Sequence, residues 1–167
     1  TTVASLGAAL VDEGKRVLLV DLDPQGCLTF SLGADPDKLP VSVHEVLLGE
    51  VEPDAALVTT AEGMTLLPAN IDLAGAEAML LMRAGREYAL KRALAKLSAD
   101  FDVIIIDCPP SLGVLTLNGL TAADEVIVPL QCETLAHRGV GQFLRTVTDV
   151  QQITNPELAL LGALPTL

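Results

Sequence analysis

Short apolar runs alternate with longer amphipathic stretches along the chain. The apolar runs predict strands, and they occupy residues 16–21, 65–68, 102–107, 126–130 and 158–164. The amphipathic stretches predict helices, and they occupy residues 1–13, 42–49, 53–58, 72–83, 86–99, 112–122 and 137–152. Strands that alternate with helices favour right-handed crossovers and a parallel sheet. We therefore expect a single α/β domain over residues 1–167, with a mostly parallel sheet flanked by helices.

The composition indicates the kind of core and the cellular setting. Half of the 167 residues are hydrophobic but only 2% are aromatic, so the core must be built from Leu, Val, Ile and Ala. No apolar run reaches the roughly 20 residues needed to span a bilayer, so we expect no membrane contact. The three cysteines form no CxxC pair and are typical of a reducing cytosol. A net charge of −12 argues against broad, non-specific nucleic-acid binding by this segment.

Two of the predicted strands end in a carboxylate and then break at proline. Residues 17–26 read VLLVDLDPQG, and residues 102–111 read DVIIIDCPPS. A buried parallel strand that ends in an acid places that acid at the rim of the sheet, where open α/β folds bind their ligands. Two such strands predict that carboxylates converge on one site. This arrangement suits a hydrated Mg²⁺ and a nucleotide phosphate, because Mg²⁺ is usually held by one or two carboxylates plus phosphate oxygens.

These motifs resemble the ParA/Soj family, a branch of the deviant-Walker-A, MinD/ParA-type P-loop ATPases that segregate plasmids and chromosomes. The most specific pieces are DLDPQG and DCPPSLG, and the resemblance extends over the whole chain through residues 6–10, 14–16, 129–133 and 139–142. It implies a three-layer P-loop-type fold. In this family a phosphate loop resembling KGGVGKT comes just before the position of Thr1. The resemblance therefore implies a fold that is incomplete at both ends, without the first strand, the phosphate loop and a C-terminal part.

The resemblance also implies roles for individual residues. It assigns nucleotide binding to Thr1, Thr2, Asp21, Pro24, Gln25 and Gly26. Asp23 would be the catalytic carboxylate near the γ-phosphate, able to orient the attacking water or to hold Mg²⁺ through a water. Asp107 would be the Walker B acid, which usually reaches Mg²⁺ through a bound water.

The residues themselves leave a structural alternative open for each acid. Asp23 could cap the turn before Pro24, because Asp-Pro starts turns readily. Asp107 could be a strand-end acid that is hydrogen-bonded to the following loop. Asp21 could position the phosphate-loop lysine of the intact protein or form hydrogen bonds inside the sheet.

For function, the resemblance implies a Mg²⁺-dependent ATPase that acts as a nucleotide switch in chromosome or plasmid partitioning, with ATP and Mg²⁺ as cofactors. It implies a homodimer, a ParB-type centromere-binding partner, non-specific DNA binding by the intact ATP-bound dimer, and a cytoplasmic, nucleoid-associated protein. We expect the intact protein to hydrolyse ATP and residues 1–167 alone to be inactive, since they lack the phosphate loop. Two alternatives remain: a non-catalytic interaction module on a degenerate ATPase scaffold, and a MinD-like ATPase that positions cell division.

Overall fold

The predicted alternation of strands and helices is present in the computed structural model, which describes residues 2–131 and 136–166, except for the side chains of residues 131 and 136–138. The strands are β1 (Val17–Asp21), β2 (Val58–Thr59), β3 (Thr65–Leu67), β4 (Val103–Asp107), β5 (Glu125–Gln131) and β6 (Ala159–Thr166). The α-helices are α1 (Thr2–Asp12), α2 (Cys27–Ser31), α3 (Val43–Leu48), α4 (Leu73–Leu81), α5 (Ala89–Ala95), α6 (Val114–Ala122) and α7 (Ala136–Ile153). Short 3-10 helices occupy η1 (Pro36–Lys38), η2 (Pro53–Ala56) and η3 (Arg86–Tyr88).

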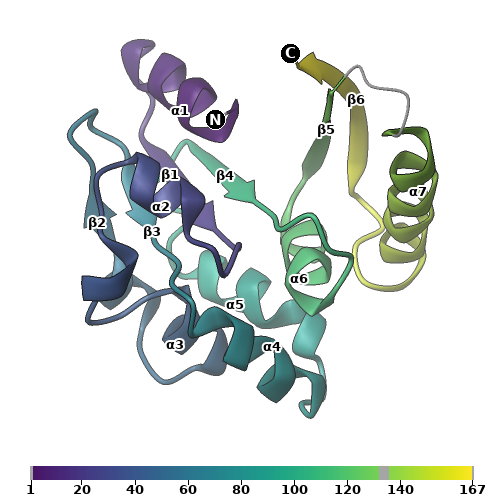
Figure 1. Ribbon diagram of the computed structural model, residues 1–167, viewed down its shortest axis with the longest axis horizontal. Helices are drawn as coiled ribbons and strands as arrows, with labels where there is room; N and C mark the ends of the chain where they lie inside the picture. Colours follow the sequence, from purple (N-terminus) through teal and green to yellow (C-terminus); the bar gives the residue numbers. More distant parts are fainter. Residues whose placement is uncertain (1, 132–135, 167) are drawn as a thin grey trace.

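The described strands form two sheets, and most of their pairings are parallel. Four strands pair in the order β2-β3-β1-β4, and β5 pairs with β6 separately (Figure 1). The pairs β1–β3, β1–β4 and β5–β6 are parallel, whereas the two-residue β2 runs antiparallel to β3. The predicted α/β fold with a mostly parallel sheet flanked by helices is therefore confirmed.

A groove of about 1730 Å³ lies between the two sheets, bordered by β4 and β5. Ile104 and Ile106 of β4 line one wall, and Val126 and Val128 of β5 line the other. In the described part of the chain, β4 pairs only with β1 and β5 only with β6, so the two edges that border the groove have no ladder partner. The residues of β4 are accordingly half-buried, whereas those of β1 are fully buried.

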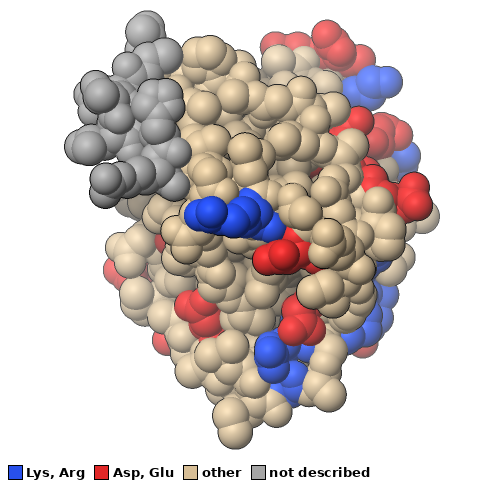
Figure 2. Space-filling model, turned by 90° about the vertical axis from the view of Figure 1, so that its right-hand side faces the viewer, with Lys and Arg blue, Asp and Glu red and all other residues tan. Residues whose placement is uncertain are grey.

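The unit made of β5, β6 and α7 has its own small core. Val147 and Val150 of α7 pack with Leu120 of α6 and with Leu158, which precedes β6. Figure 2 views the molecule from the side that carries this unit, and there acidic and basic side chains lie scattered among neutral ones. Among the described residues on this face, the basic side chains do not gather into a broad positive patch.

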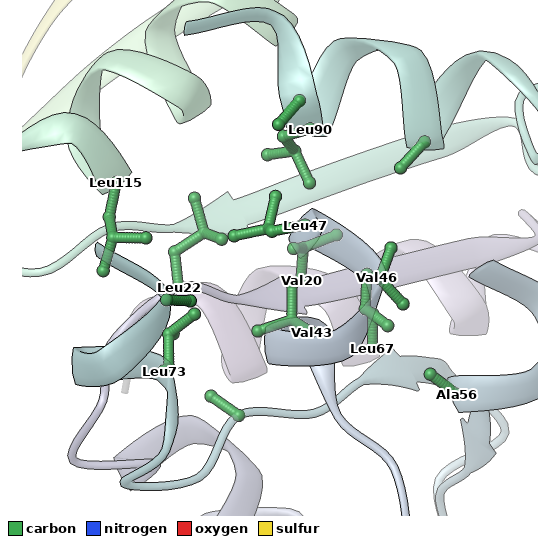
Figure 3. Close-up of a cluster of buried hydrophobic side chains, with 14 of the residues drawn as sticks. Val20, Leu22, Val43, Val46, Leu47, Ala56, Leu67, Leu73, Leu90 and Leu115 are labelled. Carbon is green, nitrogen blue, oxygen red and sulfur yellow. The ribbon is translucent and has the colours of Figure 1, made fainter. Parts of the chain in front are cut away.

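The alternation of side chains along β1 builds a three-layer structure around the four-stranded sheet. Leu18 and Val20 point into the larger core, together with residues of α3, α4, α5 and α6 (Figure 3). Val17 and Leu19 point to the opposite face and join a smaller core with α1 and α2. Because successive side chains of a strand face opposite sides of the sheet, a wholly apolar strand requires helices on both faces.

Several predicted boundaries were wrong. The helix expected at residues 53–58 is only the 3-10 helix η2, and the chain then enters β2. The helix expected at residues 86–99 consists of η3 followed by α5, which ends at Ala95. The five-residue helix α2 lies in residues 24–40, where no helix was predicted.

Candidate functional site

The two motif strands bring their terminal acids side by side. β1 and β4 are adjacent and parallel, and Asp21 is the register partner of Asp107. The desolvation caused by burial raises the pKa of Asp107, and the negative charges of Asp21 and Asp23 raise it further. Asp21 is fully buried, which raises its pKa as well, although hydrogen bonds from Thr29 and Asp23 oppose the shift. The edge of the sheet thus concentrates negative charge.

The carboxylate of Asp21 accepts three hydrogen bonds from the segment that follows β1. Its Oδ1 accepts from the backbone N–H of Asp23 at 3.0 Å. Its Oδ2 accepts from the backbone N–H of Thr29 at 2.9 Å and from the Thr29 hydroxyl at 2.7 Å. Asp21 therefore forms hydrogen bonds within the fold, to the loop after β1 and to α2 rather than to the sheet. Its role toward a phosphate-loop lysine stays a prediction.

Asp23 begins the turn that carries Pro24, Gln25 and Gly26, three of the predicted nucleotide-binding residues. Its Oδ1 accepts from the backbone N–H of Gln25 at 3.0 Å, and its carbonyl oxygen accepts from the N–H of Gly26 at 2.9 Å. Asp23 and Pro24 are half-buried, Gln25 is exposed and Gly26 is buried. The side chain of Asp23 therefore stabilises this turn through one oxygen, and this does not prevent the other oxygen from orienting a water.

Gly26 occupies a position that other residues would not easily fill. Its φ of 60° lies in the left-handed region, where glycine is favoured. A Cβ atom at this position would lie 3.1 Å from the carbonyl oxygen of Ala69, which follows β3, and 3.1 Å from Cγ of Pro36. Gly26 therefore lets the loop after β1 lie directly against the chain that leaves β3.

The chain leaves the sheet directly after Asp107. Asp107 and Thr2, the first residue of α1, both line the groove. Thr1, the other predicted phosphate-side threonine, lies outside the described residues. Cys108 also lines the groove, and burial raises the pKa of its thiol to about 12, with a further contribution from Asp107. A thiol with so high a pKa stays protonated and is a poor nucleophile or metal ligand.

The structure thus brings Asp21, Asp23 and Asp107 to one edge of the sheet, and Thr2 lines the same groove as Asp107. Among the described residues, no three or more His, Cys, Asp or Glu side chains form a group that could hold a metal ion. A site for Mg²⁺ does not need such a group, because one carboxylate, waters and phosphate oxygens suffice. The charge concentration at Asp107 fits this kind of ion. Sequence reasoning missed Thr29 and Ala69, which hold the loop in place.

Comparison with known proteins defines the class and then the family. A family model described as an AAA domain matches residues 1–160, in agreement with the α/β fold and the acids at its edge. The sporulation initiation inhibitor protein Soj of Bacillus subtilis is 47% identical over 168 residues, which cover all of this chain and 66% of Soj. The chromosome partitioning protein ParA of Myxococcus xanthus is 44% identical over 100% of this chain and 59% of that protein. The chain belongs to the ParA/Soj family of P-loop ATPases.

A solved structure from Mycobacterium smegmatis is still more similar. It is named cobyrinic acid a,c-diamide synthase, is 89% identical, and superposes with a TM-score of 0.98 over 100% of this chain and 68% of that one. The same protein has been solved with ADP and magnesium and with an ATP analogue and magnesium. The present chain spans about three fifths to two thirds of the length of the two curated relatives. None of the helices in the described residues is long and apolar enough to cross a membrane.

Proposed function

We propose that the intact protein is a Mg²⁺-dependent ATPase that works as a nucleotide switch in chromosome partitioning. The observation that carries the proposal is the register pairing of Asp21 with Asp107, with Asp23 on the loop that follows. Three acids at the C-terminal ends of adjacent parallel strands suit a cationic ligand. Relatives named Soj and ParA support the biological process, and the relative solved with nucleotide and magnesium supports ATP and Mg²⁺ as cofactors.

Each acid has a distinct part in the proposed reaction. Asp107 would complete the metal shell through a bound water, and the metal would supply charge stabilisation to the transferred phosphoryl group. Asp23 would orient the attacking water with the carboxylate oxygen that the turn does not use. Asp21 would hold the loop that carries Asp23, and the loops after Gly26 and Cys108 would respond to the γ-phosphate.

The nucleotide contacts are proposed for residues around the same edge. Thr2 begins α1 and lines the same groove as Asp107, so we propose that the N-terminal end of this helix contributes to phosphate binding. Thr1 would contribute next to it. Pro24, Gln25 and Gly26 would form the loop next to the γ-phosphate.

The proposed partners follow from the relatives rather than from the surface of this chain. We propose a homodimer in the ATP state, a ParB-type centromere-binding partner that stimulates hydrolysis, and non-specific DNA binding that leads to nucleoid association. The net charge of −12 supports a DNA-binding surface that draws mainly on other parts of the intact protein.

The deciding experiment is ATP hydrolysis by the full-length protein, with and without DNA and a ParB-type partner, beside an Asp23→Ala variant. We expect slow turnover that DNA and the partner raise and that the variant loses. Residues 1–167 alone should show negligible turnover. If the full-length protein neither binds nor hydrolyses ATP, that result would favour a degenerate scaffold instead.

A second candidate function comes from the 89% identical structure, which is named cobyrinic acid a,c-diamide synthase. Amide formation on a carboxylate also needs ATP and Mg²⁺, so the acid site alone does not separate the two reactions. The assay is incubation of the full-length protein with cobyrinic acid, glutamine, ATP and Mg²⁺, followed by mass spectrometry. A mass change matching the diamide would favour the synthase, whereas DNA-stimulated hydrolysis without this product would favour the partition ATPase.

A further inference from the structure

The hydroxyl group of Thr29 connects the ends of two strands beside the acid site. It donates to Oδ2 of Asp21, at the end of β1, at 2.7 Å. It accepts from the backbone N–H of Ala69, just after β3, at 2.9 Å. All three residues are completely buried. A hydroxyl both donates and accepts, so among side chains of this size only Thr and Ser can make this connection.

This connection closes the loop that carries Asp23. The loop leaves β1 at Asp21 and returns at Thr29, and both of its ends are hydrogen-bonded to the same carboxylate, through the N–H of Asp23 and the N–H and hydroxyl of Thr29. In its middle, Gly26 lies against the carbonyl oxygen of Ala69. The loop is therefore held on the chain after β3 at two points, and the Thr29 hydroxyl makes one of them.

We propose that Thr29 is a positioning residue for Asp23: its hydroxyl, shared between Asp21 and the N–H of Ala69, holds the loop so that the Asp23 carboxylate stays at the edge of the sheet. The consequence for hydrolysis rests on the proposed ATPase function. The holding of the loop itself rests only on the hydrogen bonds above.

Loss of the hydroxyl has a specific physical effect. The buried N–H of Ala69 would lose its acceptor and Asp21 one of its three donors, so the loop would move to restore these bonds. A shift of about 1 Å in a catalytic group costs up to roughly 100-fold in rate. Thr29 makes none of the proposed phosphate contacts, so nucleotide binding should change much less than turnover. A loss confined to the transition state lowers kcat and kcat/KM together.

The test compares Thr29→Val, which keeps the shape and removes the hydroxyl, with Thr29→Ser, which keeps the hydroxyl, in the full-length protein. We expect kcat of Thr29→Val to fall about 10- to 100-fold with KM for ATP within about threefold of wild type. Thr29→Ser should restore most of kcat. The matched control is Thr121→Val, because Thr121 is also fully buried and its hydroxyl forms a hydrogen bond at 2.8 Å, but with Thr154 and not with a residue of the loop.

A second readout does not depend on activity. Amide hydrogen exchange of residues 22–29 should be faster in Thr29→Val than in wild type, with exchange in β4 unchanged. Thr29→Ala takes the place of Thr29→Val if the latter does not fold. Turnover within twofold of wild type, together with an equally protected loop, would overturn the proposal. If wild type itself shows no turnover, the proposed ATPase function fails, and hydrogen exchange alone decides whether Thr29 holds the loop.

Discussion

Asp21 and Asp107 are register partners on adjacent parallel strands, so two carboxylates lie next to each other at one edge of the sheet. Such a pair opposes folding when both groups are charged, and burial adds a desolvation penalty. The pKa of each carboxyl is raised, mainly by burial. A bound cationic ligand would compensate the negative charge of this carboxylate pair, which gives a functional reason for the arrangement.

Neutralising Asp107 should therefore stabilise the isolated chain of residues 1–167. A carboxyl whose pKa is raised by folding favours the folded state only while it is protonated, and this contribution is lost as the pH rises through the folded-state pKa. We expect Asp107→Asn to have a higher free energy of unfolding than wild type at pH 7, and the difference to shrink as the pH falls toward 4. Urea unfolding at both pH values measures this.

The control for this prediction is Asp54→Asn, which changes an exposed carboxylate in η2. It should leave the free energy of unfolding within about 0.5 kcal/mol of wild type at both pH values. A less stable Asp107→Asn chain at pH 7 would show that the carboxylate is compensated inside the fold. In the full-length protein the same substitution should weaken binding of ATP with Mg²⁺.

The sequence predicted the acid strands well because their limits are chemically sharp. Residues 17–20 and 103–106 are wholly apolar, an acid ends each run, and proline prevents the strand from continuing. The prediction that Asp21 and Asp107 meet needed only the rule that parallel strands end at the same edge. The limits of the two strands follow from local composition, and the meeting of the two acids follows from the pairing of neighbouring strands.

The features that the sequence did not predict depend on distant contacts or on weak local signals. Thr29 and Ala69 lie 40 positions apart, and no periodicity connects them. The expected helix at 86–99 begins as the 3-10 helix η3, which follows Gly85 in the left-handed region. β2 has only two residues, too few for a pattern, and it exists because Val58 and Thr59 pair with β3.

Arg16 and Asp102 should make the folded protein more sensitive to acid. They precede β1 and β4, and the guanidinium Nη2 lies 2.8 Å from Asp102 Oδ1 while the Arg16 backbone N–H donates to Oδ2 at 2.8 Å. These bonds lower the pKa of Asp102 from 3.8 to about 2. A lowered pKa favours folding above the ordinary value and is lost as the pH falls from about 4 toward 2.

We therefore expect Asp102→Asn to lose less stability than wild type between pH 5 and pH 2.5, although it is less stable at pH 7. The measurement is the urea midpoint at several pH values, with Asp54→Asn as the exposed control. Because the pair is exposed to solvent, 1 M NaCl should reduce the difference at pH 7. Parallel pH profiles of stability for wild type and Asp102→Asn would contradict the prediction that the lowered pKa of Asp102 stabilises the folded protein.

Asn118 of α6 should be essential for packing this helix against η3 and α5. Its buried side chain accepts from the N–H of Leu90 and donates to the carbonyl oxygens of Arg86 and Val114, each at 2.9 Å. Asn118→Ala should cost about 2–4 kcal/mol in free energy of unfolding, because buried backbone groups lose their partners. Gln142→Ala, on the exposed face of α7, should change it by less than about 0.5 kcal/mol. A loss below about 1 kcal/mol for Asn118→Ala would mean that water replaces the side chain.

Gly119 of α6 and Cys108 after β4 should behave as a coupled pair. A Cβ atom at Gly119 would lie 2.5 Å from Cys108 Sγ, so Gly119→Ala must displace the thiol next to Asp107. We expect Gly119→Ala to lower the free energy of unfolding by about 1–3 kcal/mol, since the crowding exceeds the gain in helix propensity. Gly75→Ala is the matched control, because Gly75 lies within α4 with nothing within 4 Å of its added Cβ, and it should be neutral or stabilising.

The double variant Gly119→Ala with Cys108→Ala tests the cause of this destabilisation. Removing the sulfur opens the space that the new methyl group needs, so the double variant should be more stable than the sum of the two single changes. The expected coupling is about 0.5–3 kcal/mol, the range for residues in direct contact. A four-member cycle of urea unfolding measurements determines it, and strictly additive changes would show that the helix moves as a whole while Cys108 stays in place.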